Sequence, residues 1–166
     1  MGEITVMEIF LTITLWVAAI GCGLMAGVYF TFSVFVMRSL AEIPATHGIA
    51  AMQSINRVIV SSAFFPLFFG TTVAGLLLAI VPSLYWNSDS AIFSAIGGAI
   101  YVVGMFICTV AFNVPLNNRL ASLEPGDKKS MEFWKAYQRT WTRWNHVRTA
   151  ASTTASILFI YAISLS

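Results

Sequence analysis

One long apolar run constrains this chain more than any other feature. Residues 9–36 contain no charged side chain, and about 20 apolar residues in a helix are enough to cross the hydrocarbon core of a bilayer. Three further apolar runs follow, at about 58–84, 91–112 and 147–165. The pattern predicts an all-α integral membrane protein with a bundle of four transmembrane helices, in which residues 1–166 form a single membrane domain.

The composition agrees with lipid as the solvent of this chain. Only 10% of the residues are charged and 58% are hydrophobic, whereas soluble domains carry about 25% charged residues. The net charge of +2 is too small to favour nucleic acid as a partner. The expected partners are therefore membrane lipid and a small hydrophobic molecule.

The basic residues predict an orientation. Arg38 and Arg57 flank the first loop, and the other seven basic residues lie between Arg119 and Arg148. The N-terminus, the second loop and the C-terminus contain none. By the positive-inside rule, both termini lie outside the plasma or inner membrane and the two basic loops are cytoplasmic.

The long connection before the fourth run predicts an extra amphipathic cytoplasmic helix. Its aromatic residues recur at spacings of three and four and fill an arc of about 80° at 100° per residue; they are Trp134, Tyr137, Trp141 and Trp144. Lys135, Arg139 and Arg143 fill the opposite face. Two interpretations remain open, a helix that anchors the bundle to the inner leaflet and a helix whose aromatics wall a site for a flat organic molecule. A second short helix is expected in the first loop, at 45–57.

Small residues mark faces where helices approach closely. Gly23 and Gly27 form a GxxxG pair in the first run, and Pro66 is expected to kink the second. Packing within the chain is the simpler explanation of these faces, and a homo-oligomer that uses them stays open.

The predicted topology gathers polar residues at the cytoplasmic end of the bundle. The members come from four separate segments: Asn56, Asn113, Asn117, Trp141, Trp144, Asn145, His146 and Arg148, with Tyr29 and Ser33 one to two turns deeper in the first helix. Each has a simpler explanation, because the amides can cap helices and the arginines can reach the interface from within the membrane. Together they predict a polar pocket with an apolar floor, since burying such groups at the bilayer edge is costly.

No metal or nucleotide signature accompanies this cluster. His47 and His146 have no cysteine or carboxylate at ligand spacing, so no metal site and no cofactor are predicted. Cys22 and Cys108 are expected at depths about 15 Å apart, too far for a disulfide. If the chain is an enzyme, His146 is the predicted general base, and Arg148 and Asn145 are the groups predicted to stabilise an oxyanion.

Four segments resemble a known family. Residues 27–33, 48–56, 113–117 and 141–149 are similar, in the same order, to the small membrane-protein family that includes the fungal anthrone oxygenases. That resemblance implies insertion of oxygen into a polyketide anthrone to give an anthraquinone, without flavin, haem or metal. A base removes a proton from the acidic substrate, and the carbanion then reacts directly with dioxygen.

Two functions follow as hypotheses. The first is a cofactor-independent monooxygenase or related oxidoreductase for a hydrophobic aromatic substrate, with His146, Arg148 and Asn145 as catalytic groups. Its substrate-binding residues would be Tyr29, Ser33, Asn56, Asn113, Asn117, Trp141 and Trp144. The second is a non-catalytic membrane protein that binds or passes a lipid or small hydrophobic molecule. A metal or haem redox protein is the third and least supported alternative.

Overall fold

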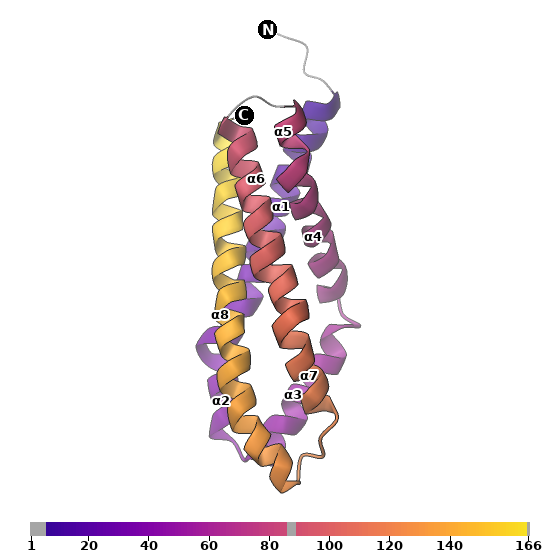
Figure 1. Cartoon of the computed structure of the whole chain (residues 1–166), viewed down its shortest axis with the longest axis vertical. Helices are drawn as coiled ribbons and strands as arrows, with labels where there is room; N and C mark the ends of the chain where they lie inside the picture. The colour runs from indigo at the N-terminus through magenta and orange to yellow at the C-terminus, as the bar shows by residue number, and fades with distance from the viewer. Residues whose placement is uncertain (1–5, 86–88, 166) are drawn as a thin grey trace.

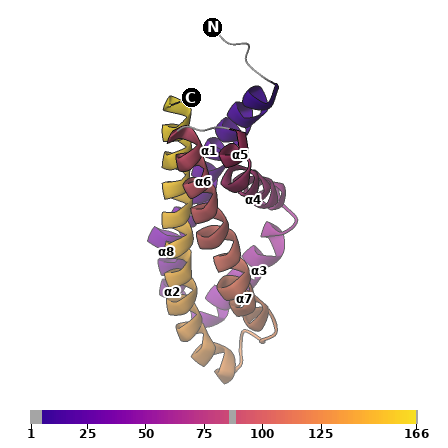
Figure 2. The same ribbon diagram turned by 45° about the horizontal axis from the view of Figure 1, so that its top comes forward.

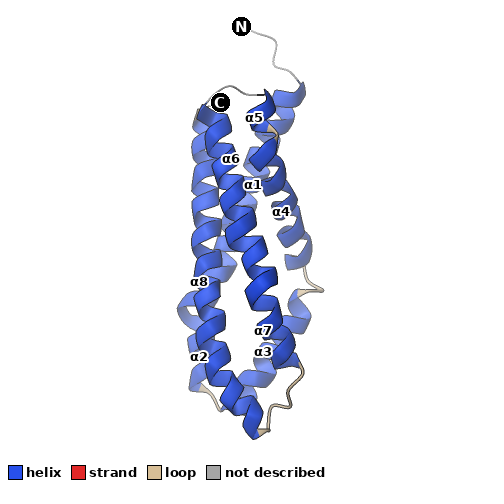
Figure 3. Cartoon of the chain, in the orientation of Figure 1, coloured by secondary structure: helices blue, strands red, loops and turns tan. Residues whose placement is uncertain are grey.

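The computed structural model describes residues 6–85 and 89–165 and contains no strand in that part of the chain (Figure 3). The helices are α1 (Val6–Thr31), α2 (Met37–Glu42), α3 (Ala45–Ile59), α4 (Phe64–Ile80), α5 (Pro82–Tyr85), α6 (Asp89–Tyr101), α7 (Val114–Ala121) and α8 (Lys128–Ser164). π-Helical segments at Phe32–Val36, Val102–Ile107 and Thr109–Asn113 make α1 continuous with α2 and α6 continuous with α7. The prediction of an all-α chain is confirmed.

Two of these continuous helices are long and apolar enough to cross a membrane. They are Val6–Glu42 and Asp89–Ala121, each with a mean hydropathy of 2.1. A third candidate is the pair α3 and α4, which together pass the same test but are bent by 61° (Figure 2). Two or three candidate spans in the described residues support an integral membrane protein.

Both long helices extend beyond the apolar runs that predicted them. The third run ends at Phe112, yet its helix passes Asn113 and Pro115 and ends at Ala121. Pro115 lacks a backbone N–H, and it stands at the start of α7, directly after a π-helical segment. The wider π-helical turns alter the bonding there, so the proline does not end the helix.

The amphipathic segment and the fourth apolar run form one helix, α8. The prediction of a separate helix before the fourth span was wrong, because residues 128–164 contain no glycine or proline that would interrupt helical hydrogen bonding. Trp134, Tyr137 and Trp141 are buried against residues of α2, α3 and α7. This part of the aromatic face therefore packs inside the protein instead of lying on the lipid surface.

The second apolar run is broken near its start. The short helix expected at 45–57 is α3, and α4 begins only at Phe64. In between, the Ser62 hydroxyl donates to the carbonyl of Ile59 at 2.8 Å and accepts the N–H of Phe64 at 3.2 Å. Pro66 lies in the first turn of α4, where its missing N–H leaves no helical bond unmade. The interruption thus precedes the proline that was expected to kink the span.

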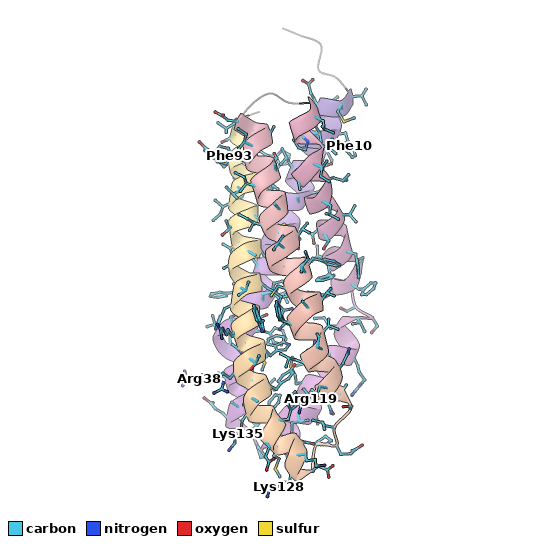
Figure 4. The ribbon with its side chains drawn as sticks, in the orientation of Figure 1. Phe10, Arg38, Phe93, Arg119, Lys128 and Lys135 are labelled. Atoms are coloured by element: carbon cyan, nitrogen blue, oxygen red, sulfur yellow. The ribbon has the colours of Figure 1, made fainter. Side chains whose placement is uncertain are left out.

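The bundle has two chemically different ends. α1, α4, α6 and the C-terminal part of α8 run side by side at one end, and α2, α3, α7 and the start of α8 form the other (Figure 1). Phe10 and Phe93 lie at the first end, whereas Arg38 and Arg119 lie toward the second, with Lys128 and Lys135 (Figure 4). The expected gathering of basic side chains at one end is confirmed.

Glycines allow the closest helix contacts. A Cβ atom on Gly98 would collide with the backbone of Gly75 and Ala79, so α4 and α6 touch through their main chains. In contrast, a Cβ on Gly27 or Gly70 would meet no atom within 4 Å. These two positions are unfilled within the chain, and the homo-oligomer through small-residue faces stays a prediction.

Candidate functional site

A cavity of about 260 Å³ lies at the bend between α3 and α4. Its walls come from α1, α3, α4, α8 and the helix that runs from α6 to α7. Most of the lining is aliphatic or phenyl. The polar and mixed-character lining residues are Tyr29, Asn56, Thr109, Asn117, Trp141 and Arg148. Five of the ten predicted site residues therefore share one cavity, together with Thr109, which the prediction missed.

Arg148 carries the one charge among the described residues that line this cavity. It is 5% exposed, and its Nη2 donates to Asn145 Oδ1 at 2.7 Å while Nη1 reaches Thr109 Oγ1 at 3.5 Å. Its Cζ lies 4.4 Å from the ring centroid of Tyr29 and 5.0 Å from that of Trp141. These two rings confine the guanidinium from the α1 and α8 sides.

The charge of Arg148 is only partly compensated. No carboxylate lies within 4 Å of it in residues 6–85 and 89–165, and its buried Nε has no hydrogen-bond partner there. A buried cation without a counter-charge is costly in an apolar medium. The arrangement therefore favours an anionic oxygen in the cavity.

Asn145 holds this arginine in place. The side chain is fully buried, and its Nδ2 donates to the carbonyl of Tyr29 at 2.6 Å and to Ser33 Oγ at 2.7 Å. With both donors used on α1 and the π-helical segment after it, Oδ1 points at Arg148. Asn145 and Ser33 do not line the cavity. Asn145 positions Arg148, and Ser33 positions Asn145.

The remaining predicted amides surround the aromatic side of the cavity. Asn117 Oδ1 accepts the Tyr137 hydroxyl at 2.8 Å and the Trp141 indole N–H at 2.9 Å. Burial raises the pKa of the Tyr137 phenol, which keeps it protonated as the donor of that bond. Asn113 Nδ2 donates to the carbonyl of Trp141 at 3.3 Å behind the lining, and Asn56 Nδ2 is buried without a partner in the described residues.

Phenylalanines form the opposite wall and were missed by the sequence analysis. Phe64, Phe65, Phe68 and Phe69 come from the first turns of α4, and Phe106 faces them from the Val102–Ile107 segment. The Phe68 and Phe106 ring centroids are 5.6 Å apart. The only sequence signal was the run Phe64-Phe65-Pro66-Leu67-Phe68-Phe69, which by itself does not separate cavity-lining phenylalanines from lipid-facing ones.

Two predicted site residues lie elsewhere. His146 is exposed and borders a surface hollow with Arg38, Arg139 and Arg143, on a different side of α8 from Arg148. Trp144 stacks on Phe112, with ring centroids 3.7 Å apart and planes 5° from parallel, and does not line the cavity. The structure does not bring the predicted base together with the arginine.

Neither cysteine is paired, as the sequence predicted. Cys22 and Cys108 are both buried and free. Within the described part of the chain, no three side chains of His, Cys, Asp or Glu are grouped so as to hold a metal ion.

Comparison with known protein families assigns the chain to one of them. The family model for anthrone oxygenase matches residues 56–158, which is more than half of the chain. The chain belongs to the anthrone oxygenase family. The resemblance seen in the sequence is thus confirmed. No curated protein and no solved structure matches the chain significantly.

The family match contains most of the cavity's polar side chains. Asn56, Thr109, Asn117, Trp141 and Arg148 fall within it. Tyr29 lies before the matched residues, although its carbonyl and ring contact Asn145 and Arg148. The cavity residues from Asn56 to Arg148 therefore lie within the part of the chain that matches the family model, and the wall from α1 lies before it.

Proposed function

We propose that the cavity binds a flat, hydrophobic aromatic molecule in its ionised form and oxygenates it with dioxygen. The observation that carries this proposal is Arg148, a buried guanidinium that has no carboxylate partner among the described residues and faces an aromatic cavity. A volume of about 260 Å³ lies just below the range of ligand pockets, which begins at about 300 Å³. That size suits a molecule of two or three fused rings.

An anthrone-type ketone fits this site chemically. Removal of a proton from the ring carbon opposite the carbonyl leaves an electron pair that is delocalised onto the carbonyl oxygen. Arg148, at hydrogen-bonding distance from that oxygen, stabilises the enolate and lowers the pKa of the substrate. Tyr29 and Trp141 bound the ring plane on one side, and the phenyl wall of α4 bounds it on the other.

The reaction then balances with dioxygen as the only co-substrate. The carbanion carbon forms a bond to dioxygen, and the resulting peroxide takes up a proton. The hydroperoxide loses water with the second hydrogen of the same carbon, which becomes a carbonyl. One dioxygen therefore gives one quinone and one water, the ring carbon is oxidised, and dioxygen is reduced.

The first proton goes to solvent base in this mechanism. The ionisable side chains among the described lining residues are Tyr29 and Arg148, and neither accepts a proton readily near neutral pH. Enolate stabilisation by Arg148 makes the C–H bond acidic enough for hydroxide or buffer to act. Rate should therefore rise with pH and with buffer base concentration.

Turnover of an anthrone tests the proposal. Purified protein in detergent, supplied with 1,8-dihydroxyanthrone and air, should form the quinone faster than the buffer does, at one dioxygen consumed per quinone. Arg148→Met should lose most of that excess rate. A quinone rate equal to that of the buffer, with the protein folded, would refute the oxygenase.

Binding without turnover is the second candidate function. The absence of histidine and carboxylate from the described lining residues favours it, because proton abstraction usually uses such groups. In that case the protein binds or passes the aromatic anion, or a lipid of similar character. Tight, Arg148-dependent binding of the dihydroxyanthrone with no excess quinone would select this function.

We also propose that the chain crosses the membrane four times, with both termini outside and the basic end cytoplasmic. Support comes from the confinement of basic residues to one end of the bundle and from the apolar C-terminal part of α8. A membrane-impermeant maleimide should label Asp89→Cys, and not Lys128→Cys, in intact cells. The reverse labelling would invert the topology.

A further inference from the structure

The exposed residues that line the cavity are all apolar. The lining residues that are exposed are Val60 (59%), Phe65 (47%), Phe69 (43%), Val110 (51%) and Val114 (38%). Of the polar lining residues, Tyr29 is 3% exposed and Arg148 is 5% exposed, whereas Asn56, Thr109 and Asn117 are half-buried. The guanidinium of Arg148 therefore lies deeper in the protein than the apolar residues at the opening.

The opening lies on the flank of the bundle. Its two sides are the start of α4 and the helix that leads into α7, and they stand apart where α3 and α4 bend by 61°. Val114 and Val110 precede the exposed Arg119 on one continuous helix, by about 8 and 13 Å at 1.5 Å per residue. If Arg119 marks the headgroup level, the opening faces acyl chains beneath it.

We propose that the ligand reaches the cavity sideways from the bilayer, through the opening between Phe65 and Phe69 on α4 and Val110 and Val114 on the opposite helix. This inference rests on the proposed function, because it concerns the same cavity. The ligand class is a planar polycyclic aromatic that partitions into lipid and carries one acidic oxygen. The ring system enters first between apolar side chains, and the oxygen then meets the guanidinium of Arg148.

The lateral route explains why charge and opening are separated. The fused rings of this class partition out of water into the bilayer, so a lipid-facing mouth samples a higher local concentration than a water-facing one. An apolar rim also leaves no polar group unsatisfied in lipid.

Alkylation at the mouth tests the route. In lipid vesicles, Val110→Cys is coupled to a benzophenone maleimide, and binding of anthracene-2-carboxylate is followed by its fluorescence in stopped flow. A plug in the mouth should slow association and dissociation together by about tenfold or more, since both directions use one path. The matched control is Val103→Cys, which lies seven residues earlier on the same helix, is 60% exposed and does not line the cavity. Its alkylation should leave both rates at the parent values.

The possible outcomes separate this inference from the proposed function. Arg148-dependent binding at parent rates, with alkylated Val110→Cys and alkylated Phe65→Cys alike, overturns the lateral route and leaves the site intact. Binding of the carboxylate that Arg148→Met does not weaken, or no binding at all, overturns the site and the route together. Phe65→Cys approaches from the other side of the mouth, so a folding defect in one variant does not prevent the test.

Discussion

Replacing Asn145 by leucine tests the polar network that holds Arg148. The substitution removes one hydrogen bond to a charged donor, at 2.7 Å, and two amide donations, at 2.6 and 2.7 Å. Buried bonds to charged groups contribute about 1.5–3 kcal/mol and neutral ones about 0.5–1.5 kcal/mol each. Bonds between membrane helices fall toward the low end of such ranges. We therefore expect Asn145→Leu to lower the free energy of unfolding by about 3 kcal/mol.

A double-mutant cycle isolates the part that belongs to Arg148. Arg148→Met removes the guanidinium and its unpaired Nε together, so the charge is no longer present to be stranded. In the double variant the Asn145–Arg148 bond is lost only once, and its destabilisation should be about 1.5–3 kcal/mol smaller than the two single values added. Reversible unfolding in mixed micelles of mild detergent and dodecyl sulfate, followed by circular dichroism, measures all four free energies.

The control cycle pairs Arg148→Met with Asn118→Leu. Asn118 is an exposed amide on α7, so the same chemical change there should be additive with Arg148→Met. Additive free energies in the Asn145 cycle as well would contradict the network, and they would mean that Asn145 stabilises the helices independently of the arginine.

Three further predictions follow from the packing and the site. Asn117→Leu removes the acceptor shared by Tyr137 and Trp141 and should destabilise the protein by about 2 kcal/mol, whereas unchanged unfolding would mean that these bonds contribute nothing. Gly98→Ala should destabilise the protein by about 1–3 kcal/mol because the added Cβ overlaps the α4 backbone. Gly70→Ala, at a position with no described atom within 4 Å, should be neutral or stabilise the protein by up to about 1 kcal/mol. Equal shifts of the melting temperature in the two variants would refute the close contact. His146→Ala should reduce quinone formation far less than Arg148→Met, and an equal loss would restore His146 as the base.

The fold was predictable where apolar length decides it. The runs at 9–36 and 91–112 became the cores of the helices Val6–Glu42 and Asp89–Ala121, and the short helix before the second run became α3. Helix ends were less predictable, because a helix continues past the last apolar residue until the backbone is interrupted. The backbone stays helical across Asn113-Val114-Pro115, where the third span was expected to end, and across residues 145–147, where the fourth was expected to begin. The helices that contain α7 and α8 are therefore longer than expected.

The site was predictable to the extent that topology alone assembles it. Five predicted residues share the cavity because the fold brings their helices together beside the bend between α3 and α4: Tyr29, Asn56, Asn117, Trp141 and Arg148. His146 lies outside the cavity for a rotational reason. Asn145, His146 and Arg148 differ by one to three residues on a helix, at 100° per residue, so His146 faces away when Asn145 and Arg148 face inward. The sequence does not say which face of this helix points inward, and the structure of α8 does.

The phenyl wall was missed for a related reason. Phenylalanines in an apolar run are ordinary lipid-facing residues, and nothing in the run itself indicates that four of them, after the break before Phe64, line one cavity. At that break the Ser62 side chain bonds to its own backbone neighbours. Side-chain bonds of this kind compete with helical hydrogen bonds, and the sequence gives little indication of where they form.

The most direct test of the central claim is the preference of the cavity for an anion over a neutral ring system of the same shape. Anthracene-2-carboxylate and 2-methylanthracene are titrated into the purified protein and into Arg148→Met. The parent should favour the carboxylate by about tenfold or more, which corresponds to a charge-assisted hydrogen bond of at least about 1.4 kcal/mol, and Arg148→Met should lose that preference. Equal affinity of the parent for both molecules, or a preference that survives in Arg148→Met, would contradict an anion site built on Arg148.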